Sequence, residues 1–241
     1  LIANRGGVLS RAGHTEAGCD LARMAGYEPA SVIVEVMNED GTMAQRPELE
    51  VFAQKHGIRI GTIADLIEYR VLNDKTVNEI DVRDIDTEAG TFQLHTYNDT
   101  TSDAIHMALT KGTISAESPC LVRVQTINTL RDILGATRPG FKQSWSTKDA
   151  LEALASADQG VLVIVGQPYQ ADQELVQIQS FPDIPAADRS VAASGVYRVI
   201  GAGSQILRAL GVGKMRLLSS PTRFNAISGF QLEVTEFVEN E

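Results

Sequence analysis

Apolar residues recur along the chain in two spacings, one typical of helices and the other of strands. Helical spacing predicts helices over residues 16–25, 46–56, 63–70, 128–134, 148–156 and 204–211. Strand patterns cover residues 31–37, 58–60, 90–97, 104–112, 119–126, 160–166, 214–220 and 230–238. Thr15 and Ser146 stand where N-caps are expected. From residue 88 on, strands come first and then alternate with helices, and this order predicts a mixed α+β fold.

One predicted strand carries an unusual residue. Residues 31–37, SVIVEVM, form an apolar β-branched run that predicts a buried strand. Glu35 interrupts this run, and a buried carboxylate is costly unless it is paired or binds a metal. Glu35 is therefore a candidate functional residue.

Two stretches lack a clear period. Residues 72–87 are charged, and we interpret them as a linker that contains at most a short strand at Val77–Val82. This linker separates a first domain, residues 1–71, from a second, residues 88–241. Residues 167–194 are polar and contain prolines, so we expect irregular structure there.

Composition narrows the class of protein. A hydrophobic content of 43% is enough for a folded core, and a net charge of −10 argues against nucleic acid or an anionic membrane as partner. The sequence contains no apolar run of transmembrane length. Cys19 and Cys120 give neither a disulfide framework nor a zinc cluster, which suits a reducing cytoplasm.

Three residues with useful chemistry lie at the start of the first predicted helix. The helix dipole and the free amides favour an anion beside His14 and Thr15, and Arg11 is close enough along the chain to share it. A lone histidine at a helix start is more often a cap or a surface group than a ligand. The residues by themselves leave both interpretations open.

Longer motifs in the same region are more specific. RAGHTEA at 11–17, E-x-MNEDGTM at 35–43 and PELEVFAQKHGIRIGTIADLIEYR at 47–70 closely resemble the C-terminal third of 3,4-dihydroxy-2-butanone 4-phosphate synthase. That enzyme converts ribulose 5-phosphate to the four-carbon precursor of riboflavin and formate.

The resemblance implies roles for four residues. His14 would bind Mg²⁺ or Mn²⁺, Arg11 and Thr15 would hold the substrate phosphate, and Glu35 would act on the sugar as the catalytic acid-base group. It also implies a homodimer. The family supplies its other metal ligand from an acidic, arginine-containing loop near its own N-terminus, and this sequence has no DRE-type loop. We therefore expect the chain to begin partway through its first domain and to be inactive alone.

The second half resembles another family. TEAGTF at 87–92, HMALTKG at 106–112, LVRV at 121–124 and GSQILRALGVGKMRLL at 203–218 resemble GTP cyclohydrolase II. In many bacteria this domain follows the synthase domain in one chain. The resemblance spans about residues 86–238 and implies the same framework.

The zinc site of that second family is lost from this sequence. Its C-x10-C-x-C positions fall on Asn128, Pro139 and Phe141, and none of these residues can supply a thiolate. The family's arginine-rich segment after the VLVIV strand reads GQPYQADQELVQ here, without a basic residue. The resemblance therefore implies a domain without zinc and without cyclohydrolase activity.

These observations favour a synthase of riboflavin biosynthesis joined to a non-catalytic cyclohydrolase-like domain. An alternative is a non-enzymatic module for dimerisation or regulation, which would recruit an authentic GTP cyclohydrolase II.

Overall fold

The computed structural model describes residues 1–102, 104–140, 143–167, 171–182, 189–221 and 230–240, with the backbone alone for residues 173 and 189–198. The chain divides into two compact units, Leu1–Val71 (unit 1) and Leu72–Glu241 (unit 2). Within the described ranges, no helix is long and apolar enough to cross a bilayer.

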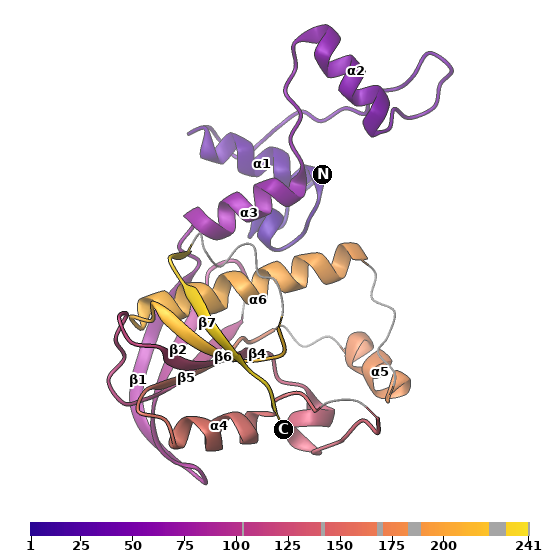
Figure 1. Ribbon diagram of the computed structural model, residues 1–241. Helices are drawn as coiled ribbons and strands as arrows, with labels where there is room; N and C mark the ends of the chain where they lie inside the picture. The colour runs from indigo at the N-terminus through magenta and orange to yellow at the C-terminus, as the bar shows by residue number, and fades with distance from the viewer. Residues whose placement is uncertain (103, 141–142, 168–170, 183–188, 222–229, 241) are drawn as a thin grey trace. The chain divides into compact units, whose positions relative to one another are not determined.

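Unit 1 is built from helices and extended segments (Figure 1). Its elements are the 3₁₀ turn η1 (Gly7–Leu9), α1 (His14–Met24), α2 (Arg46–His56) and α3 (Ile63–Asn73), whose last residues reach unit 2. Pro47 lies in the first turn of α2, and Gly57 ends that helix with a left-handed backbone, φ 64°. The Thr62 hydroxyl accepts the Asp65 N–H at 3.0 Å and so caps α3.

The predicted buried strand at residues 31–37 does not form. Only an isolated bridge joins Met37 to Met43, around a turn closed by the Asn38 N–H to the Thr42 carbonyl at 2.8 Å. Val32 is 93% exposed and Val34 85%. A strand needs a neighbour that satisfies its backbone groups, and the described residues of unit 1 provide none.

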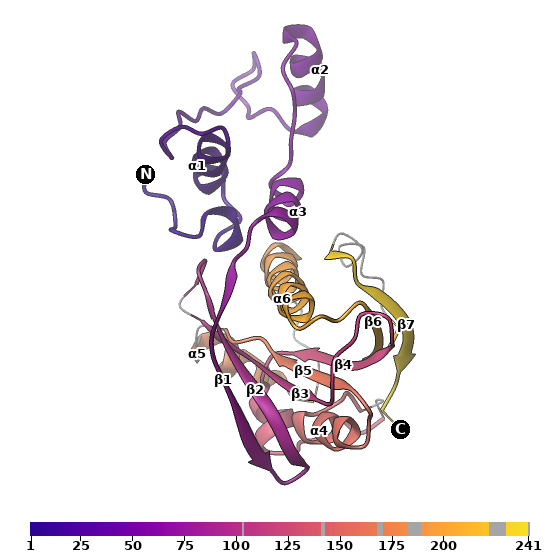
Figure 2. The same ribbon diagram turned by 90° about the vertical axis from the view of Figure 1, so that its left-hand side faces the viewer.

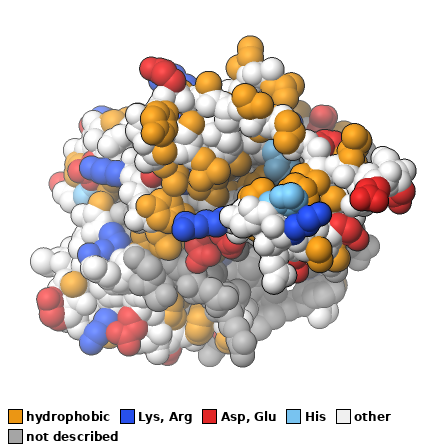
Figure 3. Space-filling view, turned by 90° about the horizontal axis from the view of Figure 1, so that it is seen from above, with side chains coloured by type: hydrophobic (Ala, Val, Ile, Leu, Met, Phe, Trp, Pro, Cys, Tyr) orange, Lys and Arg blue, Asp and Glu red, His pale blue; other side chains and the backbone are white. Residues whose placement is uncertain are grey.

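Exposed apolar side chains are common elsewhere in unit 1. Ile58 and Ile60 are 55% and 43% exposed, and the short strand predicted for them is absent from the described secondary structure. Hydrophobic side chains are scattered over the face shown in Figure 3. Unit 1 therefore carries apolar sequence that the described part of the chain does not bury.

Unit 2 is a seven-stranded mixed sheet with the order β1-β2-β3-β5-β4-β6-β7. Its strands are β1 (Val77–Thr87), β2 (Gly90–Asp99), β3 (Ile105–Lys111), β4 (Cys120–Gln125), β5 (Gly160–Ile164), β6 (Lys214–Leu218) and β7 (Glu233–Val238). The pairs β1–β2, β2–β3 and β3–β5 are antiparallel. The pairs β5–β4, β4–β6 and β6–β7 are parallel. The sheet confirms the mixed α and β fold predicted for this half.

Helices cover both faces of this sheet (Figure 2). On one face α4 (Thr147–Ala155) packs against β4 and β5, around a core of Phe92, Leu109, Leu154, Leu162 and Leu218. On the other face lies α6 (Arg189–Ala209), against β1, β4 and β5. All five residues of β5 are buried, as its continuous apolar run predicts.

Glycines allow the close approach of these layers. A Cβ at Gly160 would lie 2.8 Å from the Leu154 side chain of α4, and one at Gly203 would lie 2.7 Å from Val124 of β4. Gly203 belongs to a Gly-Ala-Gly run that superficially resembles a dinucleotide-binding turn. It lies inside α6, where it serves helix–sheet packing.

Several boundaries differ from the prediction. The expected linker, residues 72–87, is mostly the long strand β1, which is held by its antiparallel pairing with β2. The expected irregular region, residues 167–194, contains α5 (Ala171–Ser180) and the first turns of α6. Residues 129–133 form η2 (Thr129–Ile133), a short π-helical turn. The capping box predicted at Ser146 is present, with Asp149 as its partner.

A buried carboxylate closes the end of β2. Asp99 accepts the Thr101 N–H at 2.7 Å and the Ser102 hydroxyl at 2.8 Å, and its Oδ2 lies 3.7 Å from His106 Nε2. Burial alone would raise the pKa of Asp99, but the His106, Thr101 and Ser102 groups outweigh it and lower the pKa to about 2.

This pKa predicts a loss of stability in acid. An aspartate whose pKa is lower in the folded state stabilises the fold above its unfolded pKa and ceases to do so as pH falls through the folded value. The shift from 3.8 to about 2 predicts a loss of about 2 kcal/mol between about pH 4 and pH 2. Urea unfolding followed by the fluorescence of Trp145, the single tryptophan, measures it. Asp99→Asn should remove this component, whereas Asp84→Asn controls for the loss of one exposed charge. A wild-type acid dependence that survives in Asp99→Asn would contradict the assignment.

Candidate functional site

The first candidate site lies where the segment of residues 4–13 meets α1. The N-cap of α1 is Gly13, whose carbonyl accepts the Ala17 N–H at 2.9 Å. The prediction of Thr15 as N-cap is therefore wrong, because the helix starts at His14. A Cβ on residue 13 would lie 2.4 Å from Glu16 Oε2, so a larger residue would have to displace that carboxylate.

Glu16 is fully buried beside this cap. Its Oε1 accepts the Asn4 N–H at 3.0 Å and lies 3.6 Å from Arg11 NH1. The Asn4 N–H, and then the Arg11 charge, hold the pKa of Glu16 below its usual value despite burial. Arg11 keeps 65% of its side chain exposed. The contact allows two interpretations, an ion pair alone or a guanidinium held ready for an anion at the N-terminus of α1.

Asp20, one turn further along α1, is buried too. It accepts the Val8 N–H at 2.8 Å and pairs with Arg70 NH1 at 2.7 Å. A more exposed partner, Arg23, lies 2.9 Å from its other oxygen. Removing one partner from a buried pair of this kind typically costs about 3–5 kcal/mol. The inner face of α1 thus holds two carboxylates that contact the segment before it.

The structure places the other predicted site residues at the surface. His14 and Glu35 are exposed and Thr15 is half-buried. The expectation that Glu35 is a buried carboxylate is wrong, because the strand that would bury it does not form. Of the four predicted synthase-site residues, only Arg11 forms an ion pair among the described contacts, and its partner is Glu16.

These residues do not by themselves fit a metal site. Hard divalent ions such as Mg²⁺ take about six ligands, mostly oxygen. Within the described ranges, no group of three His, Cys, Asp or Glu side chains is arranged to hold a metal ion. His14 can therefore offer one ligand only.

The second candidate site is the place in unit 2 where the cyclohydrolase zinc motif would begin. Asn128 is the N-cap of η2, and its side chain accepts the Arg131 N–H at 2.9 Å. Its amide group also donates to Gln177 of α5 at 3.1 Å. The first ligand position is thus occupied by a side chain with a structural role. Of the other two motif positions, Pro139 is described, and Phe141 lies outside the described residues.

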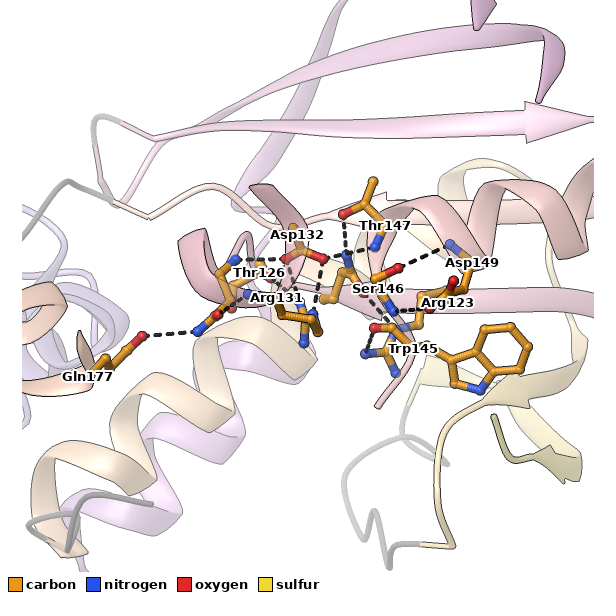
Figure 4. A network of polar contacts seen from close by, with 11 residues as sticks. Arg123, Thr126, Arg131, Asp132, Trp145, Ser146, Thr147, Asp149 and Gln177 are labelled. Carbon is orange, nitrogen blue, oxygen red and sulfur yellow. Dashed lines mark hydrogen bonds and ion pairs between the residues drawn. The ribbon is translucent and has the colours of Figure 1, made fainter. Parts of the chain in front are cut away.

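Asp132 lies at the centre of a polar network next to Asn128 (Figure 4). Its carboxylate accepts the Asn128 N–H and the Thr147 N–H, each at 2.8 Å, and pairs with Arg131 at 2.6 Å. Because Thr147 is the first residue of α4, the carboxylate occupies a helix N-terminus where an external anion would otherwise bind. Burial raises the pKa of Asp132, but the contacts with Arg131, Asn128 and Thr147 outweigh burial and hold the pKa below its usual value.

Arg123 of β4 extends the network. It donates to the carbonyl of Leu218 at 2.6 Å, to that of Trp145 at 3.2 Å and to Gln125 Oε1 at 2.8 Å. Burial, with the Arg131 charge, lowers the pKa of Arg123 to about 10. In open α/β sheets ligands bind at the carboxyl ends of parallel strands. Here Arg123 ties the ends of β4 and β6 together through internal bonds.

Sequence reasoning missed Asp20, Arg70, Arg123 and Asp132. Asp20 is four residues after Glu16, so both lie on one face of α1, and that spacing was a usable signal. Arg123 stood out only as a charged residue within an apolar strand. For the Asp20–Arg70 pair, fifty positions apart, the sequence offers no local signal.

Comparison with known proteins matches both units. Residues 1–69 match the 3,4-dihydroxy-2-butanone 4-phosphate synthase family and residues 78–239 the GTP cyclohydrolase II family. The chain is 52% identical to a Pseudomonas aeruginosa 3,4-dihydroxy-2-butanone 4-phosphate synthase, over 100% of this chain and 65% of that protein. It is 39% identical to the riboflavin biosynthesis protein RibBA of Aquifex aeolicus, over 99% of this chain and 60% of that protein.

A crystal structure gives the same result. RibBX from A. baumannii, described as a two-domain 3,4-dihydroxy-2-butanone 4-phosphate synthase, matches with a TM-score of 0.77 and 48% identity, over 100% of this chain and 63% of that one. The chain spans less than two thirds of the length of these relatives. With the C-terminal part of a synthase domain in residues 1–69, this chain is homologous to the two-domain RibBX and RibBA proteins, and through residues 78–239 it belongs to the GTP cyclohydrolase II family.

Proposed function

We propose that the chain acts as the C-terminal portion of a synthase that converts ribulose 5-phosphate to 3,4-dihydroxy-2-butanone 4-phosphate and formate. The observation that carries this proposal is the unbroken synthase match over residues 1–69, which includes the exposed Arg11 at the start of α1. A guanidinium beside a helix N-terminus suits a phosphate.

The residue roles follow from the motif. Arg11 and Thr15 bind the substrate phosphate, His14 supplies one ligand to Mg²⁺ or Mn²⁺, and Glu35 moves protons on the sugar. His14 and Glu35 are both exposed, so a substrate can reach them, and this supports the proposed roles. The metal supplies polarisation of carbonyl and hydroxyl oxygens. We further propose a cytoplasmic homodimer.

We propose that unit 2 has no cyclohydrolase activity. Asn128 caps η2, and Asp132 and Arg123 both take part in several internal hydrogen bonds. These contacts occupy the groups that a nucleotide or a metal would need. Unit 2 then serves as a framework attached to the synthase.

A second candidate function rests on the surface next to this network. Exposed apolar residues lie on and beside η2 and α5: Ile127, Ile133, Leu134, Leu175, Val176 and Ile178. Such a surface fits a non-enzymatic role in dimerisation or in binding a partner such as an authentic GTP cyclohydrolase II. In a protein that carries the complete synthase domain, Leu134→Ser should then abolish self-association or cyclohydrolase binding and leave synthase activity unchanged.

The main proposal is tested by completing the synthase domain. The N-terminal part of the synthase domain of the P. aeruginosa relative can be joined in front of residue 1, which gives a protein we call the extended fusion. We expect the extended fusion to release formate from ribulose 5-phosphate in the presence of Mg²⁺, and the 241-residue chain alone to release none. An extended fusion that folds and stays inactive would refute the proposal.

A further inference from the structure

Asp20 and Arg70 have no part in the roles proposed so far, although both are buried. Asp20 lies on α1 and Arg70 near the end of α3, and the two helices are neighbours in Figures 1 and 2. Asp20 accepts the Val8 N–H, and Arg70 NH1 donates both to Asp20 and, at 3.0 Å, to the Gly6 carbonyl. The pair therefore binds the two peptide groups on either side of Gly7, in the segment before α1.

From these two points the hydrogen bonds continue to Arg11. The Gly7 carbonyl accepts the N–H groups of Ser10, at 3.0 Å, and of Arg11, at 3.1 Å. The Arg11 carbonyl in turn accepts the N–H of Gly13, the N-cap of α1, at 2.8 Å. The backbone of Arg11 is thus fixed between a clamped turn and the helix start.

Gly7 shows how closely the turn sits on Asp20. Its φ is +62°, a conformation that other residues rarely adopt, and a Cβ there would lie 2.1 Å from Asp20 Oδ1. The turn therefore rests directly on the carboxylate. The Arg11 side chain is 65% exposed and its guanidinium contacts Glu16, so its direction depends on this backbone as well as on that ion pair.

We propose that Asp20 and Arg70 are positioning residues of the phosphate site, because they hold the turn that presents Arg11 at the N-terminus of α1. This inference rests on the proposed function for the role of Arg11. It connects the last helix of unit 1 to the first loop of the candidate site. A displacement of about 1 Å in a substrate-binding group is enough to weaken binding strongly.

Arg70→Lys tests the proposal, because lysine keeps a positive charge near Asp20 but lacks the guanidinium whose Nη1 donates to both the Asp20 carboxylate and the Gly6 carbonyl. In the extended fusion we expect KM for ribulose 5-phosphate to rise about tenfold and kcat to change less than about threefold, as for a lost binding contact. Asp20→Asn should act in the same direction. Arg23→Ala removes the exposed partner of Asp20 and is the matched control, with KM near that of the wild type.

A second readout does not depend on activity. In the 241-residue chain, Arg70→Lys should speed the hydrogen exchange of the Arg11 and Val8 amides by about tenfold, while the Ala25 amide at the end of α1 is unaffected. Unchanged exchange at Arg11 would overturn the proposal even if the extended fusion were inactive. Equal changes in KM and kcat together with a lower melting temperature would also overturn it, because the pair would then serve stability alone.

Discussion

His14→Ala in the extended fusion is expected to lower the turnover of ribulose 5-phosphate by at least about 100-fold, and Glu35→Gln by a similar factor. His14→Ala removes a proposed metal ligand, which should also weaken Mn²⁺ binding. Glu35→Gln keeps the size of the side chain and abolishes its proton transfer. Steady-state formate release measures the first effect, and Mn²⁺ titration separates the two variants.

The chain offers matched controls for both substitutions. His56→Ala removes an exposed histidine at the end of α2, and Glu39→Gln neutralises an exposed glutamate in the segment that carries Glu35. Both controls should keep rates within about threefold of the wild type, the range of a surface change without a catalytic role. Near wild-type turnover in His14→Ala or Glu35→Gln would refute the role assigned to that residue.

Restoring the zinc motif with Asn128→Cys, Pro139→Cys and Phe141→Cys together is expected to give no GTP ring opening above background. Zinc chemistry needs the three thiolates and also acid-base and nucleotide-binding groups. The segment that holds the family's arginines has no basic residue here, and Asp132 and Arg123 remain bound internally. The unmodified protein should likewise carry no stoichiometric zinc by elemental analysis. Ring opening by the triple variant would show that the framework kept its nucleotide site.

The sequence predicted the sheet of unit 2 well, because its strands bury one or both faces and so show a clear pattern. The continuous run of β5 and the capping box at Ser146 are local signals with local causes. β1 was underestimated because its exposed face is charged, and an edge strand of this kind resembles a linker. α5 was missed because the sequence around it is polar and contains prolines; in the structure Asn128–Gln177 and Thr129–Glu174 hydrogen bonds join it to η2.

The candidate site shows where sequence patterns reach their limit. The motif at residues 11–17 proposes Arg11, His14 and Thr15 as site residues, and this stays a prediction. The N-cap was wrongly assigned to Thr15 because a hydroxyl is a better cap than Gly13 in isolation. Residues 31–37 are apolar, but the prediction that they form a buried strand is wrong. A strand forms only beside a neighbouring strand, and the local sequence does not show whether there is one. The clamp of Asp20 and Arg70 exists only in three dimensions.

Complementation tests the central claim, that the synthase function is kept and the cyclohydrolase function is lost, most directly. The extended fusion is introduced into two bacterial strains that need added riboflavin, one lacking its synthase and the other lacking its GTP cyclohydrolase II. We predict growth without riboflavin in the first strain and none in the second. Growth of the second strain, or failure of the first with the protein folded and expressed, would contradict the account.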